Sequence, residues 1–282
     1  MSRRWSTIGF AAVAVTMTAS ATAAAAGLRL ATALTMNWTL GGVPVHLIGV
    51  PAAAPVGTGT CPGIRPGAIV NSDVGQCTFN FVFDGSDGAT YIGTAGHCIL
   101  GDSPIGGDVG EMEWAPGTGP EARDANDARI GEFAYAILQD PKDFSLIRLD
   151  PGVAADAQVC HFGGPTGINA DQPSDAVVLH HYGNGVAIGT VLPARSAVAI
   201  GMPDPDHVFA DGVALPGDSG SGVISDDGRA VGVLVTIGIH TASIGTSGVD
   251  AGVIGITRIE PQVARAGAVL GIGLDLAVAP PL

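Results

Sequence analysis

The sequence predicts an all-β fold, and three features of composition and patterning support this prediction. Glycine (43) and proline (19) are abundant among the 282 residues, as in chains that turn often. Charged residues make up only 13%, too few for a disordered chain, and the 46% hydrophobic content can form a large core. From residue 61 onward, short runs of β-forming residues recur about every 8–15 residues between turn residues, a spacing typical of a β-barrel or sandwich.

These runs predict a series of strands and one helix. Residues 78–83 and 89–94 are joined by the turn sequence DGSDG, so we expect them to form a hairpin. Residues 260–270 have a helical pattern, in which Pro261 is tolerated because it lies in the first turn. Further strands are expected at 129–138, 144–149, 176–182, 186–192, 222–225, 230–239 and 249–257.

The N-terminal residues 1–26 have the features of a secretory signal peptide. Two arginines precede a short apolar run at 8–19, and the small residues at 21–26 offer an A-x-A cleavage site. The apolar run is too short and too rich in threonine for an uncleaved membrane anchor. Residues 27–60 are poor in charge and are expected to be a propeptide or an N-terminal extension. The protein is therefore expected to be secreted and extracellular, without membrane contact after signal cleavage.

The formal net charge of −14 indicates an acidic surface. Such a surface disfavours binding to the phosphates of nucleic acids or to anionic membranes, so we expect neither as a partner. No cofactor and no metal are expected, because the four cysteines lack the C-x-x-C spacing of a metal site. We expect the protein to be a monomer.

Four cysteines in an exported chain favour two disulfides. Cys77 and Cys98 bracket the predicted hairpin, and the facing ends of two paired strands are close enough to bridge. The remaining two cysteines, Cys61 and Cys160, then form the second pair. A segment rich in proline, glycine and alanine at 151–167 is the best internal boundary, and it separates a first unit (61–150) from a second (151–282).

Three short strings supply a histidine, an aspartate and a serine: TAGHC at 94–98, DFSLIRL at 143–149 and GDSGSG at 217–222. A serine hydroxyl becomes a strong nucleophile when a neighbouring base removes its proton, and histidine suits that task near neutral pH. A buried aspartate holds the imidazole in the required tautomer. The three residue types in this order are therefore typical of nucleophilic hydrolysis.

We assign Ser219 as nucleophile, His97 as general base and then acid, and Asp143 as the carboxylate that orients the imidazole. Asp140 and Asp150 flank the same predicted strand and are the alternatives to Asp143, which is favoured because an apolar run follows it directly. The absence of a side chain at Gly217 leaves backbone N–H groups accessible to a developing oxyanion. The N–H groups of Gly217 and Ser219 are therefore expected to form the oxyanion hole.

These strings resemble the three active-site blocks of trypsin-like serine proteases with the chymotrypsin fold, especially secreted bacterial members. The resemblance extends over about residues 61–270, and both cysteine pairs resemble disulfides of that family. It implies two six-stranded antiparallel β-barrels, the first in 61–150 with His97 and Asp143, the second in 151–282 with Ser219 and a short C-terminal helix. It also implies hydrolysis of protein or peptide substrates through an acyl-enzyme.

The substrate-binding positions depart from the family pattern. The residue six before the nucleophile lies at the base of the family's P1 pocket; here it is Val213, which implies an apolar or small P1 side chain and not a basic one. The strand expected to pair with substrate has Thr236, Ile237 and Gly238 where the family has Ser-Trp-Gly. This departure motivates the alternative of a non-catalytic binding or adhesion protein on a protease scaffold. An internal arginine, not identified from the sequence, is the expected partner of Asp218.

Overall fold

The computed structural model describes residues 61–101, 109–171, 177–185, 193–240 and 249–282, and the backbone of three N-terminal strands. These strands are β1 (Thr16–Ala19), β2 (Leu34–Leu40) and β3 (Val43–Pro51). Apart from them, the expected signal peptide (1–26) and extension (27–60) lie outside the described residues. The expected strand at 186–192 also lies outside them. The strand β3 pairs in parallel with β17 (Val249–Arg258) and antiparallel with β13 (Ala194–Asp204).

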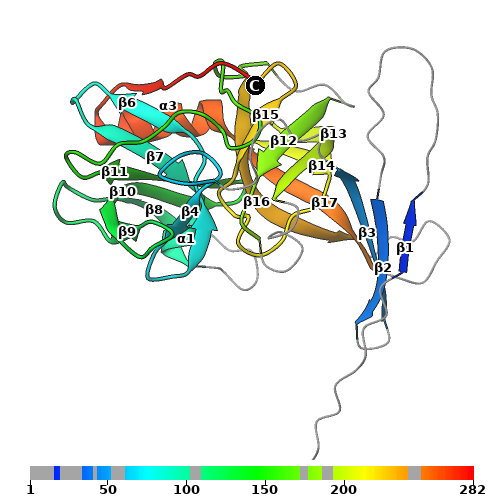
Figure 1. Ribbon diagram of the computed structural model, residues 1–282. Helices are drawn as coiled ribbons and strands as arrows, with labels where there is room; N and C mark the ends of the chain where they lie inside the picture. The colour runs from blue at the N-terminus through cyan, green and yellow to red at the C-terminus, as the bar shows by residue number, and fades with distance from the viewer. Residues whose placement is uncertain are drawn as a thin grey trace, which may run out of the picture.

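Two curled β-sheets lie side by side and make up the body of the molecule (Figure 1). The first sheet contains β4 (Ile69–Asn71), β5 (Gln76–Thr78), β6 (Val82–Gly85), β7 (Thr90–Thr94), β8 (Gly110–Glu113), β9 (Glu121–Arg123), β10 (Arg129–Gln139), β11 (Lys142–Leu149) and β18 (Leu274–Leu276). Besides β13 and β17, the second contains β12 (Val178–Tyr182), β14 (His207–Asp211), β15 (Gly222–Ser225) and β16 (Ala230–His240), to which the N-terminal strands are added.

The second sheet closes into the six-stranded antiparallel barrel that the family resemblance implied. Its strands follow the order β13-β12-β15-β16-β17-β14, and β14 pairs back with β13. Aliphatic and small side chains fill this barrel, because alternate residues of each strand point inward. Its fully buried members include Leu179, Val208, Leu234, Ile254 and Ile256.

The first sheet is curled into a half-barrel, so the two sheets together are consistent with the double-barrel fold that the resemblance implied. The strand order is β18-β6-β7-β11-β10-β9-β4-β5, with β8 on β10, and no ladder joins β5 to β6 among the described residues. The connecting segment at 79–81 crosses the gap with two hydrogen bonds to residues 67–68 on one side and two to Gly93 on the other. The N–H of Phe79 donates to the Ala68 carbonyl at 2.9 Å, and the N–H of Asn80 donates to the Gly93 carbonyl at 2.8 Å. The sheet is therefore curled like a barrel but lacks a regular closing ladder.

Aromatic side chains fill the concave side of the first sheet. The largest of them are fully buried, and they are Phe79, Phe81, Phe83, Phe133, Tyr135 and Phe144. The same core cluster includes Val233 and Val235 of β16, as well as Ile259 and Val263 of the C-terminal helix. The two halves therefore share this apolar cluster, whereas the interior of the closed barrel forms a second, separate cluster.

The C-terminal helix α3 (Ile259–Leu270) is found where the sequence predicted it, with Pro261 in its first turn. It ends at Gly271, whose φ of 66° lies in the left-handed region that favours glycine. The chain then returns to the first sheet, where β18 pairs antiparallel with β6. None of the helices in the part of the chain that the structure describes is long and apolar enough to cross a membrane.

Both disulfides predicted from the sequence are present. Cys61 is bonded to Cys160, with a Cα–Cα distance of 5.6 Å and a separation of 99 residues along the chain. Cys77 is bonded to Cys98, with a Cα–Cα distance of 6.2 Å and a separation of 21 residues. The first joins the segment before β4 to the connection between the two halves. The second joins β5 to the short helix α1 (His97–Leu100).

Replacing Cys61 and Cys160 by serine is expected to lower the free energy of unfolding by about 4–5 kcal/mol, and replacing Cys77 and Cys98 by about 3 kcal/mol. The first cost is larger because the loop that this disulfide closes is longer, so its removal releases more conformational entropy in the unfolded chain. Urea unfolding of the two double variants under oxidising conditions measures both values. Equal costs, or a larger cost for the Cys77–Cys98 pair, would contradict this account.

Candidate active site

The histidine and the aspartate of the predicted triad lie in direct contact. Nδ1 of His97 is 2.7 Å from Oδ2 of Asp143, and the backbone N–H of His97 donates to Oδ1 of Asp143 at 2.9 Å. The aspartate is the second residue of β11, where it pairs with Leu138 of β10, and only 10% of its side chain is exposed. Both carboxylate oxygens therefore bind His97, so the orientation of the imidazole is fixed.

The surroundings of this pair distinguish Asp143 from its alternatives. Asp150 lies at the other end of β11, where Arg129 binds it through two hydrogen bonds of 2.8 and 3.1 Å. Asp140 lines the same cavity as His97, at the turn before β11.

A side chain at Gly96 would collide with the carbonyl of Ile137, so glycine is required where the chain enters α1.

A cavity of about 590 Å³ lies where the two halves meet, and His97, Asp143 and Ser219 all line it. The first half contributes its wall from the segment before β5, from α1 and from the β10–β11 turn. The second half contributes the loop before β15 and residues of β16. The remaining lining residues include Val74, Gly75, Gln76, Leu138, Pro141, Lys142, Pro216, Gly217, Val235 and Thr236. The structure therefore brings the three residues of the predicted triad to one surface.

Two residues of the nucleophile loop, Gly217 and Ser219, line this cavity, and their N–H groups are the predicted oxyanion donors. The N–H of Asp218 donates to Leu215, that of Gly220 to Leu234 and that of Ser221 to Asp218. Within the described part of the chain, the N–H groups of Gly217 and Ser219 have no hydrogen-bond acceptor. Gly217 has a φ of 102°, a conformation that favours glycine. The two N–H groups that the sequence predicted for an oxyanion hole are thus without an acceptor among the described residues, in a loop that lines the cavity.

A buried ion pair holds this loop from behind and identifies the arginine that the sequence left open. The side chain of Asp218 is fully buried, and its Oδ1 lies 2.5 Å from a guanidinium nitrogen of Arg195 on β13. The same oxygen accepts the N–H of Gly185 at 2.6 Å, and Oδ2 accepts the N–H of Leu215 at 2.7 Å. Asp218 therefore has three donors, and each one limits the movement of the residue that precedes Ser219.

Beside this ion pair lies a buried histidine, His181. His181 is opposite Arg195 in the β12–β13 ladder and is 1% exposed. Burial, together with the neighbouring Arg195 guanidinium, lowers the pKa of His181 to about 3, although the Asp218 carboxylate acts in the opposite direction. The imidazole is therefore neutral in the folded protein at neutral pH.

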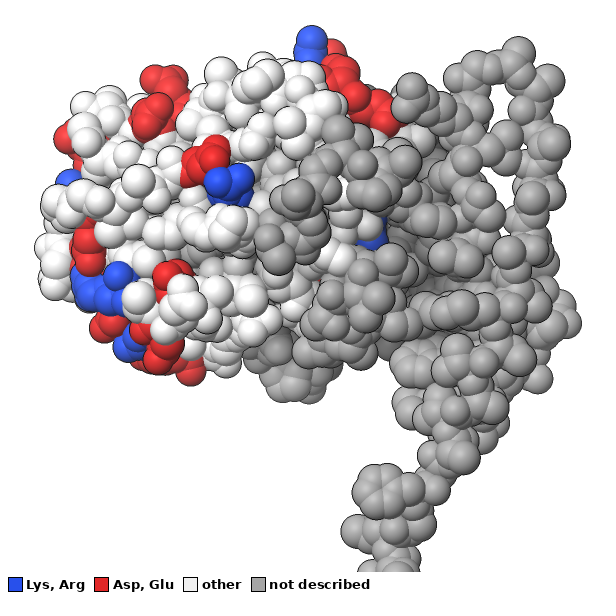
Figure 2. Space-filling model, in the orientation of Figure 1, with Lys and Arg blue, Asp and Glu red and all other residues white. Residues whose placement is uncertain are grey.

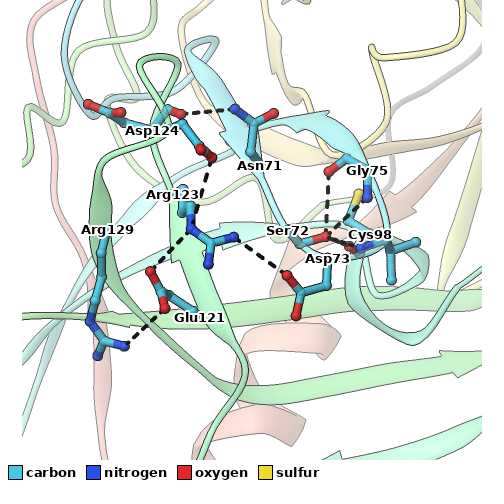
Figure 3. A network of polar contacts seen from close by, with 11 residues as sticks. Asn71, Ser72, Asp73, Gly75, Cys98, Glu121, Arg123, Asp124 and Arg129 are labelled. Atoms are coloured by element: carbon cyan, nitrogen blue, oxygen red, sulfur yellow. Dashed lines mark hydrogen bonds and ion pairs between the residues drawn. The ribbon is translucent and has the colours of Figure 1, made fainter.

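A polar network supports the segment before β5 that forms part of the cavity wall (Figure 3). The hydroxyl of Ser72 donates to the Cys98 carbonyl at 2.6 Å and so connects this segment to α1. Arg123 lies 3.5 Å from Asp73 and 3.1 Å from Glu121. Nearby, the Asp124 carboxylate accepts the N–H groups of Asn126 and Ala128 at 2.8 and 2.9 Å, so this acidic run forms a turn.

Of the four residues predicted to bind substrate, Thr236 is the one that lines the cavity among the described residues. Thr236 is exposed and lines the cavity. Val213 is partly buried and is not among the described residues that line it. The backbones of Ile237 and Gly238 pair with Ile254 and Val253 of β17. The side chains of residues 237–240 lie outside the described part of the structure.

Replacing Arg195 by leucine is expected to lower the free energy of unfolding by about 3–5 kcal/mol, because it leaves the Asp218 carboxylate buried without its counter-ion. Urea unfolding at pH 7 measures this loss. Adding Asp218→Asn to that variant removes the buried charge and is expected to recover part of the stability. A loss below about 1 kcal/mol for Arg195→Leu would contradict the assigned role of the ion pair.

The buried His181 predicts a pH dependence of stability. Its pKa is about 3 in the folded protein, against about 6.5 in an unfolded chain, so between these values the unfolded state binds one more proton. The contribution to stability is complete above about pH 6.5 and is lost as the pH falls, by up to about 1.4 kcal/mol per pH unit. In the His181→Gln variant, unfolding measured at pH 4, 5, 6 and 7 should show a slope reduced by this amount. Identical slopes would show that His181 makes no such contribution.

Comparison with known proteins supports the architecture. No family model matches the sequence, and no curated protein matches it. Among solved structures, the chain is similar to Nocardiopsis protease, with a TM-score of 0.51 and 16% identity over 76% of this chain and all of that one. It is also similar to the alpha-lytic protease homolog N4, with a TM-score of 0.47 and 18% identity over 75% of this chain and 98% of the other. The likeness to Nocardiopsis protease shows that the chain has the chymotrypsin fold.

Proposed function

We propose that the protein is a secreted serine endopeptidase that hydrolyses peptide bonds at a triad of His97, Asp143 and Ser219. The observation that carries this proposal is the doubly bonded His97–Asp143 pair, in the wall of a cavity that Ser219 also lines. The shared fold with Nocardiopsis protease supports it. A histidine with a purely structural role would not need such an arrangement. Here the buried Asp143 carboxylate binds both the ring and the backbone of His97, and both residues line a cavity.

The reaction follows from the roles of these groups. Ser219 Oγ attacks the carbonyl carbon of the scissile bond while Nε2 of His97 takes its proton. Asp143 accepts the hydrogen of Nδ1 and stabilises the imidazolium that forms. His97 then protonates the leaving amine, and an acyl-enzyme remains on Ser219. Water, activated by the same imidazole, attacks this ester and restores the serine.

The negative charge of each tetrahedral intermediate develops on the former carbonyl oxygen. The N–H groups of Gly217 and Ser219 are proposed as its hydrogen-bond donors, because both residues line the cavity and their amides have no acceptor within the described structure. Loss of one such donor typically lowers kcat about 10²–10³-fold. This contribution requires the loop to be rigid before substrate binds.

The proposed substrates are proteins or peptides with an apolar or small P1 side chain. Much of the cavity wall is apolar and includes Val74, Leu138, Pro141 and Val235. Val213, at the position where a basic-specific family member would carry an acidic residue, offers no charge for a lysine or arginine side chain. Thr236, Ile237 and Gly238 are proposed to pair with the substrate backbone.

Secretion is proposed from the signal-peptide pattern and from the two disulfides, which persist in oxidising compartments. The net charge of −14 disfavours nucleic acid and anionic membranes as partners. On the face drawn in Figure 2, charged side chains form small groups separated by wide uncharged areas, and no extended basic patch appears among the described residues. We propose that the enzyme acts as a monomer.

The second candidate is a non-catalytic binding or adhesion protein on the same scaffold. The absence of the family's Ser-Trp-Gly at residues 236–238 favours it, because that strand holds the substrate backbone in the family. The two candidates differ in one measurable property, the reactivity of Ser219.

A fluorophosphonate is expected to add once to the purified protein, and Ser219→Ala is expected to abolish the adduct without loss of folding, because the activated hydroxyl is the site of attack. Intact mass spectrometry before and after treatment measures this. Ser221→Ala is the matched control: its hydroxyl lies in the same loop but is buried and donates to the Asp218 carbonyl at 2.7 Å, so the adduct should persist. A folded wild-type protein that forms no adduct would favour the binding protein.

A further inference from the structure

We propose that Thr78 is a positioning residue of the active site, which holds the loop at 217–219 so that its two amide donors face the cavity. This inference rests on the proposed function, because it concerns the oxyanion site of the same reaction. Thr78 is the last residue of β5 in the first half, whereas the loop belongs to the second half. Its side chain is fully buried and does not itself reach substrate.

Thr78 makes two hydrogen bonds to the loop, one on each side of Asp218. The backbone N–H of Thr78 donates to the carbonyl of Ser219 at 2.8 Å. The hydroxyl of Thr78 donates to the carbonyl of Gly217, also at 2.8 Å. One residue of the first half therefore fixes the carbonyl groups at both ends of the three-residue segment that contains the proposed oxyanion donors.

The direction of the hydroxyl hydrogen follows from a second neighbour, Asn184. The backbone N–H and the side-chain amide nitrogen of Asn184 lie 3.2 and 3.3 Å from the Thr78 oxygen, and both of these groups are donors. The Asn184 amide is held in turn by the carbonyl of Gly67 at 2.7 Å. The hydroxyl oxygen thus accepts from Asn184, and its single hydrogen is directed to Gly217.

This hydrogen bond matters because Gly217 has unusual conformational freedom. At a φ of 102° it is in a region that glycine occupies readily, and glycine also permits rotation of the adjoining peptide planes. The Gly217 carbonyl belongs to the peptide joining residues 217 and 218, next to the peptide that carries the Ser219 N–H. Holding that carbonyl selects one orientation of the loop, so the donors are in place before the oxyanion forms.

Thr78 also lies beside the general base. Its neighbour Cys77 is bonded to Cys98, which directly follows His97. The hydroxyl of Thr94 donates to the carbonyl of Thr78 at 2.9 Å and lies 3.6 Å from the sulfur of Cys98. The position of the nucleophile loop is therefore set relative to the chain segment that holds the imidazole, across the contact between the two halves.

The test compares phosphonylation of the wild type, Thr78→Val and Thr78→Ser over a range of fluorophosphonate concentrations. Valine keeps the shape of the side chain but removes the donor to Gly217, and serine restores it. In Thr78→Val the maximal rate constant is expected to fall about 10–100-fold, because the phosphoryl oxygen uses the same donors. The half-saturating concentration is expected to stay within about twofold, since the cavity walls are unchanged. Thr78→Ser should recover most of the rate.

Thr166→Val is the control for the substitution itself. It removes a threonine hydroxyl that donates to the carbonyl of Asp227 at 3.1 Å, outside the described lining of the cavity, and should leave the rate constant unchanged. If the wild type and Thr78→Val react at the same maximal rate, the inference about Thr78 is overturned and the proposed function is not affected. So does a Thr78→Ser variant as slow as Thr78→Val. A folded wild type that does not react overturns the proposed function, and this inference with it.

Discussion

The ion pair between Arg195 and Asp218 is the interaction on which the arrangement of the site depends. A fully buried carboxylate is costly unless charge and hydrogen bonds compensate its lost hydration. Here one guanidinium and two backbone amides do so, and all three donors come from segments that surround the nucleophile loop. The loop is thereby fixed by a residue adjacent to Ser219, while the serine itself remains at the cavity. Asp218 and Ser219 are consecutive residues of one turn, which buries the Asp218 carboxylate and places Ser219 at the cavity.

The two halves contribute different physical constraints to the site. The first half is packed with aromatic side chains, and it holds His97 through the Asp143 carboxylate and the Cys77–Cys98 disulfide. The second half is a closed barrel of aliphatic and small side chains, and it presents the loop with Ser219. The shared apolar core and the hydrogen bonds from Thr78 align these two parts. The geometry at the cavity is therefore a property of the contact between the halves.

The sequence was sufficient for those features that depend on local pattern. The strings around His97, Asp143 and Ser219, the helix near the C-terminus and the cysteine pairing are all encoded within short windows or simple spacing. It was insufficient where no local motif marks a residue's partner. Arg195 pairs with Asp218 across 23 residues, and nothing in its own neighbourhood distinguishes it from other arginines.

The local sequence pattern also failed to predict some strands and sheet connections. The strands β13 and β14 were not expected, because glycine, proline and aspartate at 201–206 are typical of a loop. Residues 79–81 bond to residues 67–68 on one side and to Gly93 on the other without forming a named strand, and no periodicity encodes this. Asn184 and Thr78 gave no signal either, since isolated polar residues acquire a role only when the fold brings their partners to them.

The return of the chain to its first sheet has a consequence for how the molecule is made. The strand β18 pairs with β6, so residues 274–276 complete a sheet whose first strand, β4, begins at Ile69. The first half therefore cannot reach its final pairing while the rest of the chain is still being synthesised. Completing the first sheet is therefore a non-local event that depends on the C-terminal residues and not on the first half alone.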